Sequence, residues 1–189
     1  MSYSVTVVVG NPRPRSRTRD VAVALAERLI DADARELTVV DLADHLDDVF
    51  VHPAPALDDI AAEVVASDLA IFASPTYKAS HTGLLKAFLD RYPADALAGL
   101  PAIPVLTGAD ERHLLGASVS LAPLLAELGA VVPGRGFYFV TGDMTRLDEA
   151  VEEAARTYVR NIDGVSRLTI ALTRHSLAAA GKTGTTGAS

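Results

Sequence analysis

The sequence predicts an α/β protein: one doubly wound parallel sheet of five strands with helices on both faces. Two observations favour this fold class. Strand-like and helix-like segments alternate along the 189 residues, and repeated β-then-α units place parallel strands between helices. Polar, turn-forming loops stand where a strand passes into a helix, which is where ligands bind in open α/β sheets.

The elements follow from hydrophobic periodicity. Residues 3–9 are β-branched and nearly continuous, as expected of a central strand that is buried on both faces. Strands are predicted over residues 3–9, 36–41, 69–73, 102–107 and 136–140, with a short strand at 131–132 before the last. Helices are predicted over residues 21–30, 57–66, 84–90, 113–128 and from 145 to about 172.

Proline and glycine residues support several of these helix boundaries. Pro55 opens one helix, with Asp58 and Asp59 near its positive end. Gly129 stops the helix predicted over 113–128. Pro104 is awkward in a central strand, because proline donates no ladder hydrogen bond. These five strands fit the order 2-1-3-4-5 of a doubly wound sheet.

One domain accounts for most of the chain. We expect it to span residues 1–175, which is long enough to enclose a substantial core. Residues 176–189 are mostly small and polar, so we expect a disordered tail there.

The composition of the chain argues against several classes of partner and site. The formal net charge of −7 argues against nucleic acid. No apolar run approaches the roughly 20 residues that span a bilayer, and no signal segment is evident, so we expect a cytoplasmic protein. The chain has no cysteine, which excludes disulfides, thiolate catalysis and thiolate metal sites. No histidine and carboxylate spacing indicates a metal site either.

The loop after the first strand, residues 10–18, indicates an anion site. Ser16 or Thr18 can cap the following helix and leave its first N–H groups free, and a helix N-terminus binds phosphate. Four arginines, at positions 13, 15, 17 and 19, add positive charge. The loop contains neither a Walker sequence nor a dinucleotide fingerprint, so a mononucleotide phosphate is the better hypothesis.

Two further loops meet the same edge of the sheet. One begins at Ser74 and continues through Pro75, Thr76, Tyr77 and Lys78. The other holds Thr107, Gly108, Ala109 and Asp110. In the order 2-1-3-4-5 these loops lie beside the phosphate loop, where they can enclose a flat ring.

The block Ser74-Pro75-Thr76-Tyr77-Lys78-Ala79-Ser80-His81-Thr82-Gly83-Leu84-Leu85-Lys86 resembles the isoalloxazine-binding loop of the NAD(P)H-dependent FMN reductases, which have a flavodoxin-like fold. Residues 10–18 resemble the phosphate loop of that family, with Asn11 where serine is common. The similarity covers roughly residues 4–140 and is strongest at 74–97, and parts of residues 105–129 match the alkanesulfonate-type FMN reductases.

The resemblance implies FMN and NAD(P)H as cofactors and hydride transfer from nicotinamide to flavin. The residues that it implies at the flavin are Arg15, Ser16, Arg17, Thr18, Pro75, Thr76, Tyr77, Lys78, Thr107, Gly108, Ala109 and Asp110. We assign no catalytic side chain, and His81 and His113 receive no proton-transfer role, because the flavin supplies the chemistry. A flavin-dependent monooxygenase is a possible recipient of the reduced flavin. By analogy with such families we expect a homodimer or homotetramer built on helices 84–92 and 113–128.

Three alternatives stay open at this point: a quinone or azo reductase on the same scaffold, a flavodoxin-type electron carrier and a flavin-free relative. The carrier is disfavoured because flavodoxins have a T-x-T-G-x-T type of loop where this chain has Arg15-Ser16-Arg17-Thr18.

Overall fold

The computed structural model describes the backbone of residues 2–183 and the side chains of residues 2–168 and 170. One parallel sheet has the order β2-β1-β3-β4-β5, which confirms the predicted order. Its strands are β1 (Tyr3–Val9), β2 (Arg35–Asp41), β3 (Leu69–Pro75), β4 (Ala102–Gly108) and β5 (Phe137–Val140). The main helices are α1 (Arg17–Leu29), α2 (Pro55–Ala66), α3 (Gly83–Leu89), α4 (Ala122–Glu127) and α5 (Leu147–Thr183).

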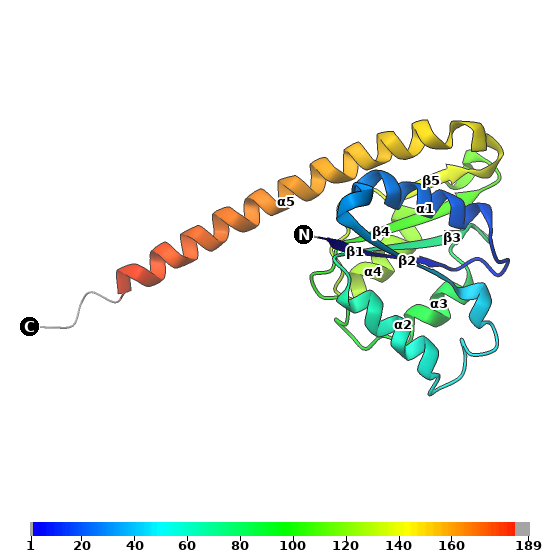
Figure 1. Cartoon of the computed structure of the whole chain (residues 1–189), viewed down its shortest axis with the longest axis horizontal. Helices are drawn as coiled ribbons and strands as arrows, with labels where there is room; N and C mark the ends of the chain where they lie inside the picture. Colours follow the sequence, from blue (N-terminus) through cyan, green and yellow to red (C-terminus); the bar gives the residue numbers. More distant parts are fainter. Residues whose placement is uncertain (1, 184–189) are drawn as a thin grey trace, which may run out of the picture.

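Helices cover both faces of the sheet (Figure 1). α1 and α5 lie on one face, and α2, α3 and α4 lie on the other. Side chains alternate between the two resulting cores along each strand: Val7 and Val9 pack toward α1 and α5, whereas Val8 joins the core beneath α2 and α3. Each face of the sheet therefore buries its own hydrophobic cluster.

Pro104 does stand in a central strand. β4 pairs with β3 on one side and β5 on the other, and Pro104 lies opposite Phe72. The missing N–H of one residue does not prevent the neighbouring residues of β4 from pairing.

The single helix predicted over 113–128 is wrong in its first half. Glu111–His113 forms a short 3-10 turn, Ala117–Leu121 is π-helical, and only Ala122–Glu127 is α-helical. Pro123 supplies the physical reason, because a proline ring clashes with the carbonyl four residues before it in an α-helix. The wider π turn carries the chain past this clash.

Two smaller expectations also need correction. The strand predicted at 131–132 is a single bridge between Pro101 and Val131. α5 continues to Thr183 instead of ending near residue 172, since the run Ala178-Ala179-Ala180 has high helix propensity. The rest of the predicted tail, 184–189, lies outside the described residues. Among the residues that are described, no helix combines the length and apolar character that a membrane span needs.

A buried hydroxyl ties three elements together beneath the carboxyl edge of the sheet. Thr82 Oγ1 donates a hydrogen bond to the Gly10 carbonyl at 2.6 Å and accepts one from the Leu85 N–H at 3.2 Å, which caps α3. The Thr82 N–H donates to Ser74 Oγ at 2.9 Å. Thr82 therefore joins the end of β1, the end of β3 and the start of α3.

Gly10 permits this close approach. A Cβ placed on Gly10 would overlap the Cβ of Leu85, on the first turn of α3. The Gly10 N–H also donates to the Ala73 carbonyl at 2.7 Å, so the residue cannot move away without a loss of sheet pairing. Glycine is thus required here for space.

Gly10→Ala should therefore destabilise the protein by about 1–3 kcal/mol, the usual cost of forcing an extra methyl group into a packed core. Gly142→Ala is the matched control, because a Cβ at Gly142 would meet nothing within 4 Å. Urea denaturation of both variants measures the difference. Equal stability of the two variants would contradict the packing argument.

A buried arginine holds the segment before α2. The Arg91 side chain is only 2% exposed; it donates to the Val51 carbonyl at 2.9 Å and to Asp58 Oδ1 at 2.5 Å. The Arg91 hydrogen bond lowers the pKa of Asp58 below its ordinary value of 3.8. The ionised carboxylate therefore stabilises the fold.

This stabilisation should depend on pH with a definite sign. Because the folded-state pKa of Asp58 is lowered, its contribution is complete above pH 3.8 and is lost as the pH falls through the lowered value. We expect Asp58→Asn to reduce the unfolding free energy at pH 7, and the deficit relative to the unmodified protein to shrink below pH 4, measured by urea denaturation across this range. Asp59→Asn, which alters an exposed neighbour, should give no such deficit at either pH.

Candidate flavin site

Loops from the carboxyl ends of β1, β3 and β4 enclose a pocket of about 710 Å³. It brings together ten of the twelve predicted site residues: Arg15, Ser16, Arg17, Thr18, Pro75, Thr76, Tyr77, Thr107, Gly108 and Ala109. Asn11, Arg13, Pro14 and Thr141 complete the lining. Lys78 and Asp110 do not line it. The three loops converge because their strands are neighbours in the sheet.

The start of α1 presents unused hydrogen-bond donors to this pocket. Ser16 is the N-cap, and its hydroxyl accepts a hydrogen bond from the Arg19 N–H at 3.3 Å. Arg17 and Thr18 are the first two helical residues, whose N–H groups have no intrahelical acceptor. The helix dipole adds partial positive charge at this point. The end of α1 is therefore suited to an anion.

The Thr18 hydroxyl is hydrogen-bonded within the protein. The residue is buried, and its Oγ1 accepts a hydrogen bond from Asn11 Nδ2 at 3.1 Å and shares another with Thr107 Oγ1 at 2.8 Å. These two partners occupy the hydroxyl, so the backbone N–H is the group that Thr18 offers to an anion. The side chain instead joins the loop after β1 to the end of β4.

The tip of the phosphate loop is held from the neighbouring strand. Arg15 has a left-handed backbone, with φ 52°, and its N–H donates to Asp41 Oδ2 at 3.0 Å. Asp41 is buried at the end of β2 and also accepts a hydrogen bond from the Ala43 N–H. Sequence reasoning missed Asp41. Its place at the carboxyl end of a predicted strand beside the first one was the available signal.

The charge of the pocket is positive. Arg13, Arg15 and Arg17 line it, whereas none of its lining residues is acidic. Arg17 also donates to the Thr141 carbonyl at 3.2 Å, which directs the guanidinium across the pocket mouth. Arg19, the fourth arginine of the cluster, lies instead by a neighbouring hollow with Asp41 and Asp44.

The loop after β3 forms a tight turn at the rim. The N–H and carbonyl groups of Tyr77 and Ser80 exchange two hydrogen bonds, and Lys78 and Ala79 take left-handed conformations between them. This turn leaves the Tyr77 ring half exposed at the pocket and places Lys78 at the tip, outside it. Lys78 lies outside the lining because a two-residue turn reverses the chain there.

Thr76 places a polar atom in the pocket floor. Its N–H donates to the Thr107 carbonyl at 2.7 Å, which fixes the loop on β4. Its Oγ1 is buried beside the Tyr138 hydroxyl but has no partner with hydrogen-bond geometry in the described structure. A buried hydroxyl without a partner is costly, so a ligand atom here would satisfy it.

The loop after β4 is shaped by Tyr138. The Tyr138 hydroxyl donates to the Asp110 carbonyl at 2.8 Å and lies where a Cβ of residue 108 would be, so only glycine fits at Gly108. Burial raises the pKa of Tyr138, which keeps it protonated as a donor. The Asp110 carboxylate accepts the Arg112 N–H at 3.0 Å, so it caps the following turn instead of lining the pocket.

His81 and His113 both lie outside the pocket lining. Burial lowers the pKa of His81, which favours its neutral form. Among the side chains that the structure describes, residues 2–168 and 170, no group of three His, Cys, Asp or Glu could hold a metal ion.

Comparison with known proteins agrees with this geometry. Residues 3–145 match the family model of the NADPH-dependent FMN reductases. An FMN reductase (NADPH) of Pseudomonas aeruginosa is 32% identical over 146 residues, which cover 75% of this chain and 78% of that protein. The NADH-dependent FMN reductase SfnF of Pseudomonas putida is 32% identical over 140 residues, covering 71% and 75%.

A solved structure is also similar. The crystal structure of an oxidoreductase from Corynebacterium diphtheriae has a TM-score of 0.76 and 28% sequence identity, covering 86% of this chain and 98% of that one. Together these matches confirm the resemblance, the flavodoxin-like fold and NAD(P)H-dependent FMN reduction as the activity. The chain belongs to the NADPH-dependent FMN reductase family.

Proposed function

We propose that the loop at the start of α1 binds the phosphate of FMN. The observation that carries this assignment is a helix N-terminus surrounded by three arginines in a pocket without acidic lining. The Arg17 and Thr18 N–H groups and the Ser16 hydroxyl would donate to phosphate oxygens. Arg15 and Arg17 would supply the neutralising charge.

The isoalloxazine ring would then lie against Pro75, Thr76 and Tyr77, with residues 107–109 along its other edge. Thr76 fits this role because it lines the pocket and its N–H fixes the loop to the Thr107 carbonyl. Gly108 fits because it lines the pocket and has no side chain of its own. Whether Lys78 and Asp110 reach the ligand stays a prediction, since both stand outside the pocket lining.

Bound FMN would supply the acceptor for the hydride of NAD(P)H. The work of the protein is then to hold the two rings in a productive orientation and to exclude water. No side chain of the pocket needs to transfer a proton, and neither His81 nor His113 lines it. We infer that reduced flavin serves a flavin-dependent monooxygenase in the cytoplasm, although quinone and azo compounds are alternative acceptors.

We also infer a homodimer or homotetramer. Leu114, Leu115 and Val119 are exposed apolar residues on the 113–128 segment, which supports the predicted interface there. The 84–92 helix supports it less, because Leu85 and Phe88 face the core.

Ser16→Ala should weaken FMN binding selectively. The change removes one hydrogen bond to a charged group, worth about 1.5–3 kcal/mol, so FMN affinity should fall about 10- to 100-fold. Riboflavin has no phosphate, so its affinity should change little. Fluorescence titration of each variant with both flavins measures this.

Thr18→Val is the matched control, because it removes a hydroxyl that is bonded within the protein. Thr18→Val should reduce the stability of the protein and lower its affinity for FMN and for riboflavin by similar factors. Equal loss of FMN and riboflavin affinity in Ser16→Ala, or an FMN-specific loss in Thr18→Val, would reject our placement of the phosphate.

Tyr77→Ala should slow flavin reduction without unfolding the protein, because Tyr77 is half exposed at the pocket rim. Loss of its contact with the ring should lower the reduction rate by roughly tenfold or more through poorer orientation. Anaerobic stopped-flow mixing of FMN-loaded protein with NADH or NADPH, followed by flavin bleaching, gives the rate. His81→Ala and His113→Ala should have smaller effects.

Two results would change the proposal. If neither nicotinamide reduces the flavin while a one-electron donor does, the protein is an electron carrier. If His113→Ala alone abolishes transfer with FMN still bound, His113 has a catalytic role.

A further inference from the structure

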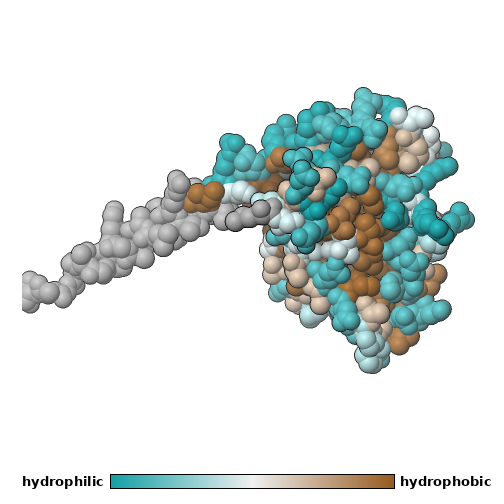
Figure 2. Space-filling view, viewed as in Figure 1, coloured by the Kyte–Doolittle hydropathy of each residue, from teal (hydrophilic) through white to brown (hydrophobic). Residues whose placement is uncertain are grey.

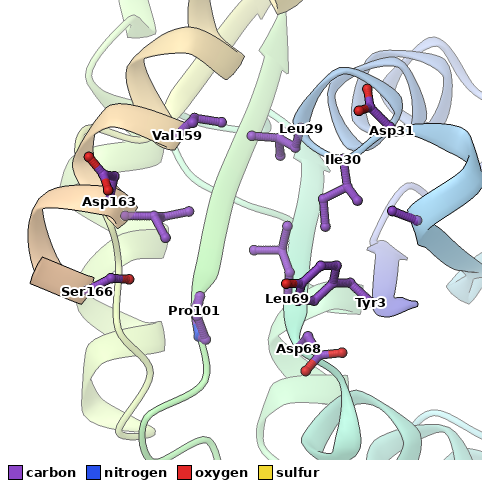
Figure 3. Close-up of a pocket in the computed structure, with 12 residues that line it drawn as sticks. Tyr3, Leu29, Ile30, Asp31, Asp68, Leu69, Pro101, Val159, Asp163 and Ser166 are labelled. Carbon is purple, nitrogen blue, oxygen red and sulfur yellow. The ribbon is translucent and has the colours of Figure 1, made fainter. Parts of the chain in front are cut away.

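A second hollow lies at the opposite edge of the sheet from the flavin pocket and shares no residue with it. This amino-edge groove has a volume of about 650 Å³. Figure 3 shows Val159, Asp163 and Ser166 of α5 on one side, Tyr3, Ile30 and Leu69 on the other, and Pro101 between them. Most of its lining is apolar. The function proposed above involves no residue of this groove.

α5 forms one wall of this groove, and beyond that wall the helix extends away from the rest of the domain. Val151, Ala155 and Tyr158 are buried against the sheet, and Asn161 donates to the Pro133 carbonyl at 2.8 Å. The helix then continues as an arm, residues 164–183, which projects well beyond the body (Figure 1).

The arm carries apolar side chains into solvent. Leu168 is 60% exposed and Ile170 is 53% exposed, and hydrophobic side chains are visible at the base of the arm (Figure 2). In the sequence, apolar residues recur every three or four positions along α5, at Tyr158, Ile162, Val165, Leu168 and Leu172. This spacing is typical of a helix that packs along one stripe. The apolar spacing of the sequence thus continues past the part of α5 that packs on the body.

Charge distinguishes the arm from the groove. From residue 164 onward the sequence has three cationic residues, Arg167, Arg174 and Lys182, and no Asp or Glu, in a chain of net charge −7. The groove lining includes the carboxylates of Asp31, Asp68 and Asp163 but no Lys or Arg. Arg167 pairs with Asp163 on its own helix at 2.6 Å, and Asp68 accepts two hydrogen bonds from Ser4, so Asp31 on the groove side and Arg174 and Lys182 in the arm sequence carry the remaining charge. A basic, apolar helix therefore complements an acidic-rimmed, apolar groove.

We propose that the arm of one copy docks in the amino-edge groove of a second copy, and that the exchange is reciprocal. The arm cannot enter its own groove, because α5 is a continuous helix that leaves from the groove wall at Asp163 and Ser166. Under twofold symmetry each copy gives one arm and receives one, so every contact forms twice.

This interface is separate from the exposed patch at Leu114, Leu115 and Val119. Two different isologous interfaces on one chain are what a tetramer of dihedral symmetry requires. The arm thus determines whether a dimer becomes a tetramer. Flavin reduction in each subunit should not depend on it, since the groove and the flavin pocket lie at opposite edges.

The absence of native cysteine allows a clean crosslinking test. Full-length Leu168→Cys, carrying an affinity tag, is mixed with untagged Asp31→Cys under mild oxidation. Docked cysteines have an effective concentration on the order of millimolar, so the tagged, mixed covalent dimer should exceed the control by at least about tenfold. The control pairs tagged Leu168→Cys with Val65→Cys, a half-exposed apolar site on α2.

Sedimentation of Leu168→Glu provides an independent measurement. We expect the mass of the assembly to fall by half relative to the unmodified protein, with the rate of NAD(P)H oxidation per subunit unchanged, whereas Val65→Glu should alter neither. Mixed dimer no greater than the control, or an unchanged mass for Leu168→Glu, would overturn the proposal. Arm-dependent binding to anionic lipid vesicles without crosslinking would overturn it too, and would assign the arm to a membrane surface.

Discussion

The hydrogen bonds of Thr82 are the constraint on which the site depends. The hydroxyl of one residue fixes the end of β1 to the start of α3, and its N–H fixes the same turn to the end of β3. Because Gly10 leaves room for α3 to approach, these ends stay in register. Loops that leave β1 and β3 therefore begin from fixed points, and a pocket lies between them.

Much of this architecture was predictable from periodicity. Runs of β-branched residues such as 3–9 predict strands that are buried on both faces of the sheet. The polar loops that follow these runs predict which edge of the sheet binds a ligand. The site was predicted less well, because side-chain direction is set by tertiary contacts. Lys78 stands at the tip of a turn, Asp110 caps the next turn, and the Thr18 hydroxyl is bonded internally. Asp41 was missed because its role appears only once β2 lies beside β1.

The two edges of the sheet differ in chemistry. At the carboxyl edge, backbone N–H groups and arginines gather around a pocket without acidic lining. At the amino edge, aliphatic side chains and carboxylates gather around the base of α5. This division follows from a parallel sheet, where all strands deliver their carboxyl ends to one side. The residues at the two edges can therefore vary independently in the same domain.

The contact between the Thr18 and Thr107 hydroxyls has a kinetic consequence. It links the loop after β1 to the end of β4, so two sides of the pocket are held to each other. A flavin entering such a pocket loses its own freedom but need not order the protein. Its departure likewise requires only that its direct contacts break. The rates of FMN binding and release should then depend on its own contacts with the pocket and little on rearrangement of the loops.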